Sequence, residues 1–297
     1  MSDVIRKKRK KKIPWGQVGL HTFYIISCLT YILPIWLLVS ISLSGETILK
    51  FSLIPKKLST FAYEMAFRNP EQIIRAYAVT FFYSIAGVVL SLAVMSLFAF
   101  ALSRKNFKLK KLLTRILFVN MLFGGGLVPT YMVVSGMLHL NDTIWVYIIP
   151  SLVSGWDVIL IKTYFQNLPE EVFESARMDG ASEARLCFQI AIPMSVPILA
   201  TQAYGKFLGG WNDWVCSSIY IRKPELYSLQ YLLKLFMDRT DMTAQLMGGG
   251  ISSAELVAAS ETIRYAMAII GVGPAFLIFP FIQKYYEKGL VVGSLKG

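Results

Sequence analysis

The part of this chain best suited to specific chemistry is a polar stretch, residues 169–192, between two long apolar segments. Pro169 and the acids that follow it suit the first turn of a helix, where the helix dipole is positive, and predict a helix over 170–178. Gly180 stands where a left-handed residue would end that helix. The chemistry that this pattern favours is recognition, because an amphipathic helix ringed by charge can dock in a groove of a partner.

A second short helix is predicted over 183–190, capped by Ser182 and ending before Pro193. On the first helix, Val172, Phe173 and Ala176 lie on one apolar face at helical spacing. Such a helix can also lie on a lipid surface, but lipid binding favours Lys and Arg on the polar face. The acids of this helix would be repelled by anionic lipid, so we expect a protein partner to receive the apolar face.

The chain shows little sign of catalytic or metal-binding chemistry. Cys28, Cys187 and Cys216 are scattered, and their spacing matches no metal site or disulfide framework. His21 and His139 are far apart in the sequence and give little support to acid–base chemistry. We therefore expect a chain that is not an enzyme by itself, with no catalytic residue, no metal and no cofactor of its own.

The composition indicates an all-α integral membrane protein. Of the 297 residues, 55% are hydrophobic and only 16% are charged, and the mean hydropathy is +0.53. A soluble domain of this size carries far more charge. Six apolar segments reach the roughly 17–20 residues needed to cross a hydrocarbon core. These predicted spans are 17–41, 79–102, 112–138, 143–165, 198–219 and 264–282.

The distribution of the net charge of +12 predicts how the chain is oriented. The basic run 6–12 and most other Lys and Arg fall on one side of the predicted spans, which the positive-inside rule identifies as the cytoplasmic side. Six spans then place both termini in the cytoplasm, as a basic tail over 1–16 and a second tail over 285–297. We expect the basic tail to contact anionic lipid rather than nucleic acid. The first apolar segment is too long for the core of a cleaved signal peptide and is expected to remain as a span.

Polar residues within the predicted spans are candidates for a substrate pathway, because polar groups are costly inside a membrane. Taken singly, each is better explained as a bridge between helices or an anchor at the membrane interface. As a group, at least one is expected to line a pathway. The candidates are Asn120, Trp156, Gln202, Tyr204, Trp211, Asn212 and Asp213.

The spacing within the polar stretch is similar to the EAA motif of ATP-binding cassette (ABC) importer permeases. That motif runs Glu-Ala-Ala, three residues, Gly, nine residues, Ile-x-Leu-Pro. The chain matches it with Glu174, Ser175, Ala176, Gly180, Ile190, Ile192 and Pro193. Ser175 for Ala and Ile192 for Leu are departures that preserve helix and bulk. Asp179, Phe188 and residues 211–213 resemble the carbohydrate-uptake branch, in particular the maltose-type second permease. The ending 288–297 resembles a Gram-positive subfamily for complex oligosaccharides.

This resemblance implies the type I ABC importer permease fold, with six transmembrane helices over 17–284 and a cytoplasmic coupling helix, in a bacterial cell membrane. It also implies a second, different permease subunit, an ATPase dimer that binds ATP and Mg²⁺, and an external lipoprotein that delivers a carbohydrate. The implied coupling residues are Phe173, Glu174, Ser175, Ala176, Asp179, Gly180, Phe188 and Pro193. In the tail, Gly293, Ser294 and Gly297 would reach between the ATPase subunits, and a disordered tail is the equal alternative.

Two other stretches leave alternatives open. Gly124, Gly125 and Gly126 interrupt the third predicted span, and close helix packing is favoured there over unwinding beside a cavity. The stretch 222–262 is predicted to be a long external loop, either a contact for the delivery protein or a lid over the tops of the spans.

The main rival function is a stand-alone secondary carrier or channel for a small polar solute. A carrier would be expected to show paired charges within the membrane or inverted repeats, and neither is evident in the sequence. A structural scaffold would leave Gly180 and its spacing unexplained. The sequence therefore favours a permease subunit of an ATP-driven carbohydrate importer.

Overall fold

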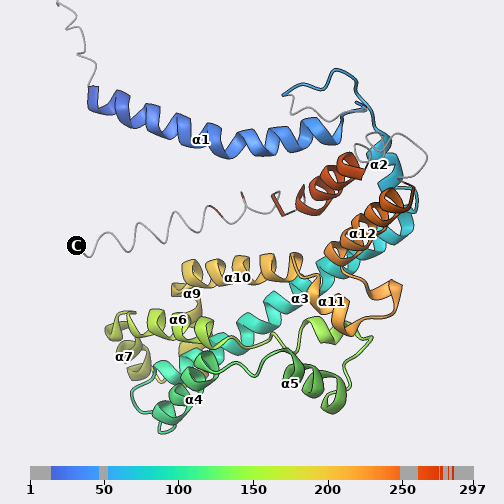
Figure 1. Ribbon diagram of the computed structural model, residues 1–297. Coiled ribbons are helices and arrows are strands. Elements are labelled where there is room, and N and C mark those ends of the chain that lie inside the picture. Colours follow the sequence, from blue (N-terminus) through green and yellow to red (C-terminus); the bar gives the residue numbers. More distant parts are fainter. Residues whose placement is uncertain are drawn as a thin grey trace, which may run out of the picture. The chain divides into compact units, whose positions relative to one another are not determined.

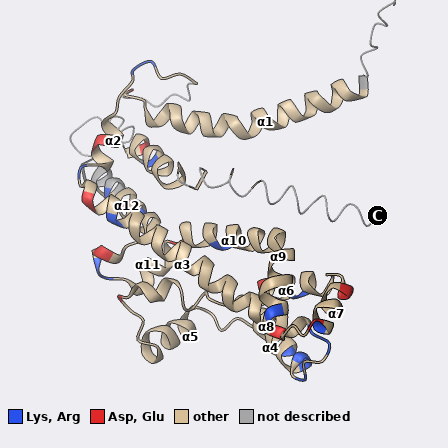
Figure 2. Ribbon diagram, turned by 180° about the vertical axis from the view of Figure 1, so that it is seen from behind, with Lys and Arg blue, Asp and Glu red and all other residues tan. Residues whose placement is uncertain are grey.

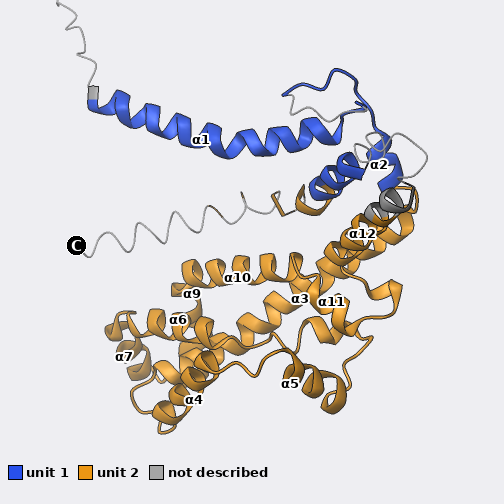
Figure 3. Cartoon of the chain, viewed as in Figure 1, with its two compact units in different colours: residues 1–66, 243–269 blue, residues 67–242, 270–297 orange. Residues whose placement is uncertain are grey.

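The computed structural model describes residues 15–46, 53–247 and 260–273, with 275–276, 280 and 283 beyond them. Its elements are helices, joined by turns (Figure 1). The chain divides into two compact units, one of residues 1–66 and 243–269, the other of 67–242 and 270–297 (Figure 3). The predicted tail residues Gly293, Ser294 and Gly297, and most of the basic tail 1–16, lie outside the described residues.

The first unit contains a long apolar helix, α1 (Trp15–Ser42), which matches the predicted span 17–41. The short helix α2 (Phe61–Ala66) follows it. The hydroxyl groups of Ser42 and Tyr63 are hydrogen-bonded at 2.8 Å, which ties the end of α1 to α2.

The second unit is built around α3 (Pro70–Ser103), which begins well before the predicted span 79–102. Helices α6 (Gly155–Gln166) and α10 (Val196–Trp211) pack against it. Small residues recur on the buried face of α3 at helical spacing and let neighbouring helices approach closely. They are Ala76, Thr80, Ser84, Gly87, Ser91, Ala99 and Ser103.

The third predicted span, 112–138, is broken. Helix α4 (Lys110–Leu122) and the segment made of α5 (Leu127–Tyr131) and the π-helix η1 (Met132–Met137) meet at a bend of 118°. A Cβ added at Gly124 or Gly126 would meet nothing within 4 Å. Within this chain the glycines do not pack closely, and the chain is unwound between α4 and α5. The predicted cavity beside them stays a prediction. Consecutive glycines weaken a helix because they lose the most backbone freedom on folding.

The fourth and fifth predicted spans are also interrupted. In 143–165, the 3₁₀-helix η2 (Ile144–Tyr147) is followed by non-helical residues before α6 begins. In 198–219, α10 ends at Trp211 and α11 (Val215–Tyr220) begins after a break. The carboxylate of Asp213 accepts the backbone N–H of Cys216 at 2.9 Å, which favours a new helix start over continuation.

The predicted external loop 222–262 contains helical structure that the sequence analysis missed. The 3₁₀-helix η4 (Pro224–Leu226) leads into α12 (Leu229–Met247). The backbone N–H of Leu229 donates to the hydroxyl of Thr80 on α3 at 2.8 Å. The triple glycine after α12 lies outside the described residues. Of the predicted span 264–282, residues 264–273 are helical.

The polar stretch folds as α7 (Glu170–Met178), α8 (Glu183–Leu186), the π-helix η3 (Cys187–Ala191) and α9 (Ile192–Met194). We call α7, Gly180 and α8 the elbow. Pro193 lies inside α9 and not beyond a finished helix, so the predicted end before Pro193 is wrong. The helix continues because Pro193 lies in the first turn of α9, where its missing N–H is not needed. In Figure 2, charged residues gather at the end of the second unit that contains the elbow.

Length and composition mark two described helices as able to cross a membrane, residues 16–42 of α1 and all of α3. Two bent helix pairs pass the same criteria only when each pair is taken together: α4 with 127–137, and 183–194 with α10, which meet at 78°. The described residues therefore contain two such helices, or up to four spans if each bent pair crosses. The prediction of six spans stays a prediction.

Candidate functional site

The elbow turns at Gly180 through a hydrogen-bonded helix end. Gly180 has φ +80°, the left-handed conformation that the sequence predicts. The N–H of Ala181 donates to the carbonyl of Ala176 at 2.9 Å, and that of Gly180 to the carbonyl of Arg177 at 3.0 Å. These two bonds form a Schellman motif, which satisfies carbonyls at the end of α7. Ser182 then caps α8 by accepting the N–H of Arg185 at 3.3 Å.

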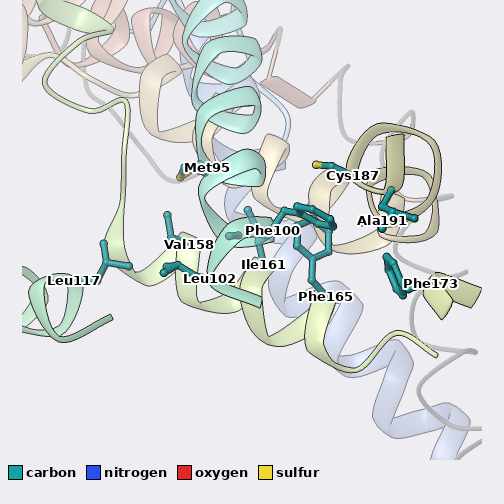
Figure 4. Packing of buried hydrophobic residues seen from close by; sticks show 12 residues of the cluster. Met95, Phe100, Leu102, Leu117, Val158, Ile161, Phe165, Phe173, Cys187 and Ala191 are labelled. Atoms are coloured by element: carbon teal, nitrogen blue, oxygen red, sulfur yellow. The ribbon is translucent and has the colours of Figure 1, made fainter. Parts of the chain in front are cut away.

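The apolar face of α7 points into the protein. The side chain of Phe173 is 1% exposed and packs in a cluster with Phe165, Leu186 and Cys187 (Figure 4). Ala176 packs against the same cluster. The expectation that a partner receives this face is therefore wrong for Phe173 and Ala176, which the neighbouring helices of the chain cover, whereas Val172 is exposed. Phe173 positions the elbow instead.

The outward side of the elbow combines acids with exposed apolar side chains. Met178, at the end of α7, is 89% exposed, and Phe188 is also exposed. Glu174 and Asp179 are also exposed. Met178 was not among the predicted coupling residues, although it is the most exposed apolar residue of α7, ahead of Val172 at 39%. An exposed apolar side chain among acids is typical of a docking surface.

Ion pairs hold the two helices of the elbow in place. Arg177 lies 3.6 Å from a carboxylate oxygen of Glu170 and 3.4 Å from one of Glu183, so it links α7 with the start of α8. Lys105, after α3, lies 3.6 Å from Glu170. Exposed pairs of this kind contribute little stability, and we assign them an orienting role. Pro193, a predicted coupling residue, lies beyond the elbow in α9.

A polar cavity of about 370 Å³ lies within the second unit. Its walls come from α3, from α10, from the start of α6 and from the segment before it. The residues lining it are Tyr83, Ser84, Gly87, Tyr147, Ser151, Asp157, Gln202, Gly205, Lys206, Gly209, Gly210 and Asp213.

The predicted pathway residues do not all meet at this cavity. Gln202 and Asp213 line it, whereas Tyr204 and Asn212 line a second, mostly apolar hollow of similar volume on another face of α10. Trp211 is fully buried, and its indole N–H donates to the carbonyl of Gly271 at 2.8 Å. Its role is therefore to bridge helices.

The two remaining candidates, Asn120 and Trp156, are exposed and line neither hollow. Two charged residues of the cavity, Asp157 and Lys206, were visible in the sequence as charges inside apolar segments. Both are better candidates than Asn120 and Trp156.

The cavity wall offers both aromatic and hydrogen-bonding groups. Tyr83 and Tyr147 are stacked, with ring centroids 4.2 Å apart and an interplanar angle of 7°. The ammonium group of Lys206 donates to the carbonyl of Ser151. The hydroxyl of Ser84 is buried and has no hydrogen-bond partner among the described residues. Because unsatisfied buried polar groups are costly, this hydroxyl is available to a polar ligand or to water.

Comparisons with known proteins place this geometry in a family. Residues 79–292 match the model of the binding-protein-dependent transport system inner membrane component. The chain is 34% identical to Protein LplC of Bacillus subtilis over 269 residues, 90% of each chain. It is 31% identical to the polygalacturonan/rhamnogalacturonan transport system permease protein YtcP of the same organism, over 94% of this chain and 97% of that protein. A solved bacterial ABC transporter chain, from a system that imports the acidic polysaccharide alginate, superposes with a TM-score of 0.76. That chain is 25% identical, over 92% of this chain and 96% of the other.

Proposed function

Because the chain belongs to the binding-protein-dependent transport system inner membrane component family, it is a permease subunit of an ABC importer, and we propose that the elbow couples it to the ATPase. ATP hydrolysis is carried out by separate subunits. The observation that carries the proposal is the left-handed turn at Gly180, which holds α7 and α8 at a fixed angle and leaves Met178 exposed. Such a rigid, protruding element suits a groove of a partner.

We propose further that the cargo is an oligosaccharide that passes along the polar cavity. The relatives YtcP and the galactooligosaccharide permease GanQ carry names of sugar transport systems. Sugars bind through hydroxyl hydrogen bonds and contacts with aromatic rings, and the cavity lined by Gln202, Asp213 and the two tyrosines offers both. The proposed pathway therefore keeps Gln202 and Asp213 and adds Lys206.

The proposed assembly follows the family. A second, different permease completes the channel, two ATPase subunits bind ATP and Mg²⁺, and an external solute-binding lipoprotein delivers the sugar. We propose six spans with both termini in the cytoplasm, lipid contact by the basic tail, and an ATPase contact by the tail over 285–297. The positive-inside distribution of Lys and Arg supports this orientation.

One observation favours a second candidate function. Asp157 and Lys206 both line the cavity, and charges of opposite sign inside a membrane are typical of carriers driven by an ion gradient. A secondary carrier would lose uptake when an ionophore collapses the gradient, and it would not need ATP. The elbow has no evident use in such a carrier.

The test is co-purification followed by uptake. A tagged chain isolated from its bacterial membrane is expected to bring an ATPase and a second permease with it. Cells are then offered two sets of labelled oligosaccharides, one neutral and one carrying uronic acids. Uptake of either set that stops when ATP is depleted supports the proposal. Uptake that continues without ATP but stops with an ionophore would replace it with the secondary carrier.

Met178 provides a sharper test of the docking surface. Replacing Met178 by Ala is expected to weaken ATPase binding about tenfold, as truncation of an exposed apolar contact at the centre of an interface does. Met242, which is 65% exposed on α12, is the matched control. Met242→Ala should leave ATPase binding unchanged. Equal effects of the two changes would mean that Met178 is not at the interface.

A further inference from the structure

Arg104, the first residue after α3, lies over two aromatic rings that belong to different elements. Its guanidinium carbon is 4.3 Å from the ring centroid of Phe173 on α7 and 4.6 Å from that of Phe100 on α3. Its Nε–H donates to the hydroxyl of Ser103 at 3.1 Å. Both rings belong to the buried cluster under the elbow (Figure 4). Arg104 therefore joins the elbow to the end of α3.

The contact depends on a planar cation and not on an ion pair. Arg104 forms no ion pair in the part of the chain that the structure describes, whereas Glu170 is paired with Lys105 and Arg177. Burial lowers the pKa of the Arg104 guanidinium from its ordinary value, and the carboxylates of Glu170 and Glu183 act in the opposite direction. An arginine keeps its charge in proteins, and its flat face stacks on rings as a lysine cannot.

The helix that carries Arg104 also forms a wall of the cavity. α3 is continuous over Pro70–Ser103 and lines the cavity with Tyr83, Ser84 and Gly87. From Gly87 to Arg104 the helix covers roughly 25 Å at about 1.5 Å per residue. A continuous helix carries a displacement over this length as a rigid element.

The chain joins the elbow to the cavity wall in two directions. It runs backward through residues 167–169 into α6, whose Asp157 lines the cavity, and forward through a bend. After α8 the chain passes through η3 and α9 and bends by 78° before α10 begins at Val196. The residue at the bend, Ser195, ends α9 without capping the next helix through its side chain. A bent junction can change its angle when it is pushed from one end. The contact through Arg104 reaches the cavity wall without passing through this bend.

We infer that Arg104 is a positioning residue that makes the elbow and α3 move as one body, so that displacement of the elbow is passed to the cavity wall. This inference rests on the proposed function, in which the ATPase moves the elbow. The charge and the planar shape of the Arg104 guanidinium both contribute to this contact. Loss of Arg104 should therefore separate ATP hydrolysis from movement of α3.

The experiment measures one distance within the chain in the assembled complex. Spin labels are placed at Glu171→Cys on α7 and Ile85→Cys on α3, both exposed, after Cys28, Cys187 and Cys216 are replaced by Ala. Distances are recorded without nucleotide and with ATP, Mg²⁺ and vanadate. With Arg104 present, the distance should stay the same in both states. With Arg104→Ala it should shift or broaden when ATP and vanadate are added, while ATP hydrolysis stays within about twofold.

Matched variants separate this role from general stability. Lys105→Ala removes the neighbouring cation, whose side chain is 81% exposed, and should behave as the unsubstituted chain. Arg104→Lys keeps the charge without the planar face and should give an intermediate result. Phe173→Leu keeps an apolar side chain in the cluster but removes the ring under Arg104, so it should give the same change in distance as Arg104→Ala. It provides the test if the complex with Arg104→Ala does not assemble.

Two outcomes would overturn different statements. An unchanged distance in both Arg104→Ala and Phe173→Leu, with normal ATP-driven uptake, would overturn the role of Arg104 and leave the proposed function intact. Absence of ATP hydrolysis from the complex that contains the unsubstituted chain would overturn the proposed function itself.

Discussion

Gly180→Asp is expected to abolish ATP-driven uptake while the chain still inserts into the membrane. Gly180 adopts φ +80°, where a side chain costs about 1 kcal/mol or more. A Cβ at this position would meet nothing within 4 Å, so the backbone conformation and the added charge decide the effect. The new carboxylate would lie beside Asp179 at the end of α7, where the helix dipole is already negative. Both effects turn α8 away from its native direction.

The measurement compares the amount of the chain in the membrane with the rate of ATP-driven uptake. Gly180→Asn introduces a side chain of nearly the same size as that of Asp but without the charge. Asn also tolerates the left-handed conformation better than most residues. This variant should retain part of the uptake. Gly126 has a similar φ of +82° but a ψ of −179°, a conformation that is essentially restricted to glycine, so it offers no matched control. Uptake that stays normal with Gly180→Asp would exclude a coupling role for Gly180.

The elbow could be predicted closely because its signals are local. The bounds of α7, the left-handed Gly180 and the cap at Ser182 each depend on a few neighbouring residues. The direction of the apolar face could not be predicted in the same way. Periodicity shows that Phe173 and Ala176 share a face, but only the tertiary structure shows that the chain itself covers that face. The exposed side chain of Met178 was overlooked for the same reason.

The sequence located the apolar segments, but it did not predict that the third, fourth and fifth of them are broken and are not continuous helices. Hydropathy measures whether a segment is apolar, and it does not register the glycines at 124–126 or the turn at Asp213 as breaks. The helix α12 was missed because its sequence mixes polar and apolar residues, although Ser228, directly before it, caps it by accepting the backbone N–H of Tyr231 at 3.3 Å.

Candidate residues of the cavity were only partly accessible to sequence reasoning. Gln202 and Asp213 stand out as polar residues in apolar segments. Tyr83 and Tyr147 do not, because tyrosines are common near membrane interfaces and their stacking joins α3 to a distant segment. Long-range pairing of this kind is a property of the fold.

Gly209→Leu is expected to block uptake without destabilising the chain. Gly209 lies on α10, lines the cavity and has nothing within 4 Å of an added Cβ. A leucine side chain would therefore occupy part of the cavity of about 370 Å³ instead of colliding with neighbours. Leucine also favours a helix over glycine by roughly 0.8–1 kcal/mol, so the folded chain should be at least as stable. Gly210 is unsuitable, because an added Cβ would lie 3.0 Å from the hydroxyl of Ser84.

The control for Gly209→Leu is the same substitution at Gly19 on α1, which also has nothing within 4 Å of an added Cβ and does not line the cavity. Uptake should fall by about tenfold or more with Gly209→Leu and stay unchanged with Gly19→Leu, while both complexes still hydrolyse ATP. Hydrolysis without uptake would place the block in the pathway, because the elbow and its ATPase contact are intact. Uptake at the normal rate through Gly209→Leu would instead mean that the sugar passes elsewhere, and that the cavity has a structural role between α3 and α10.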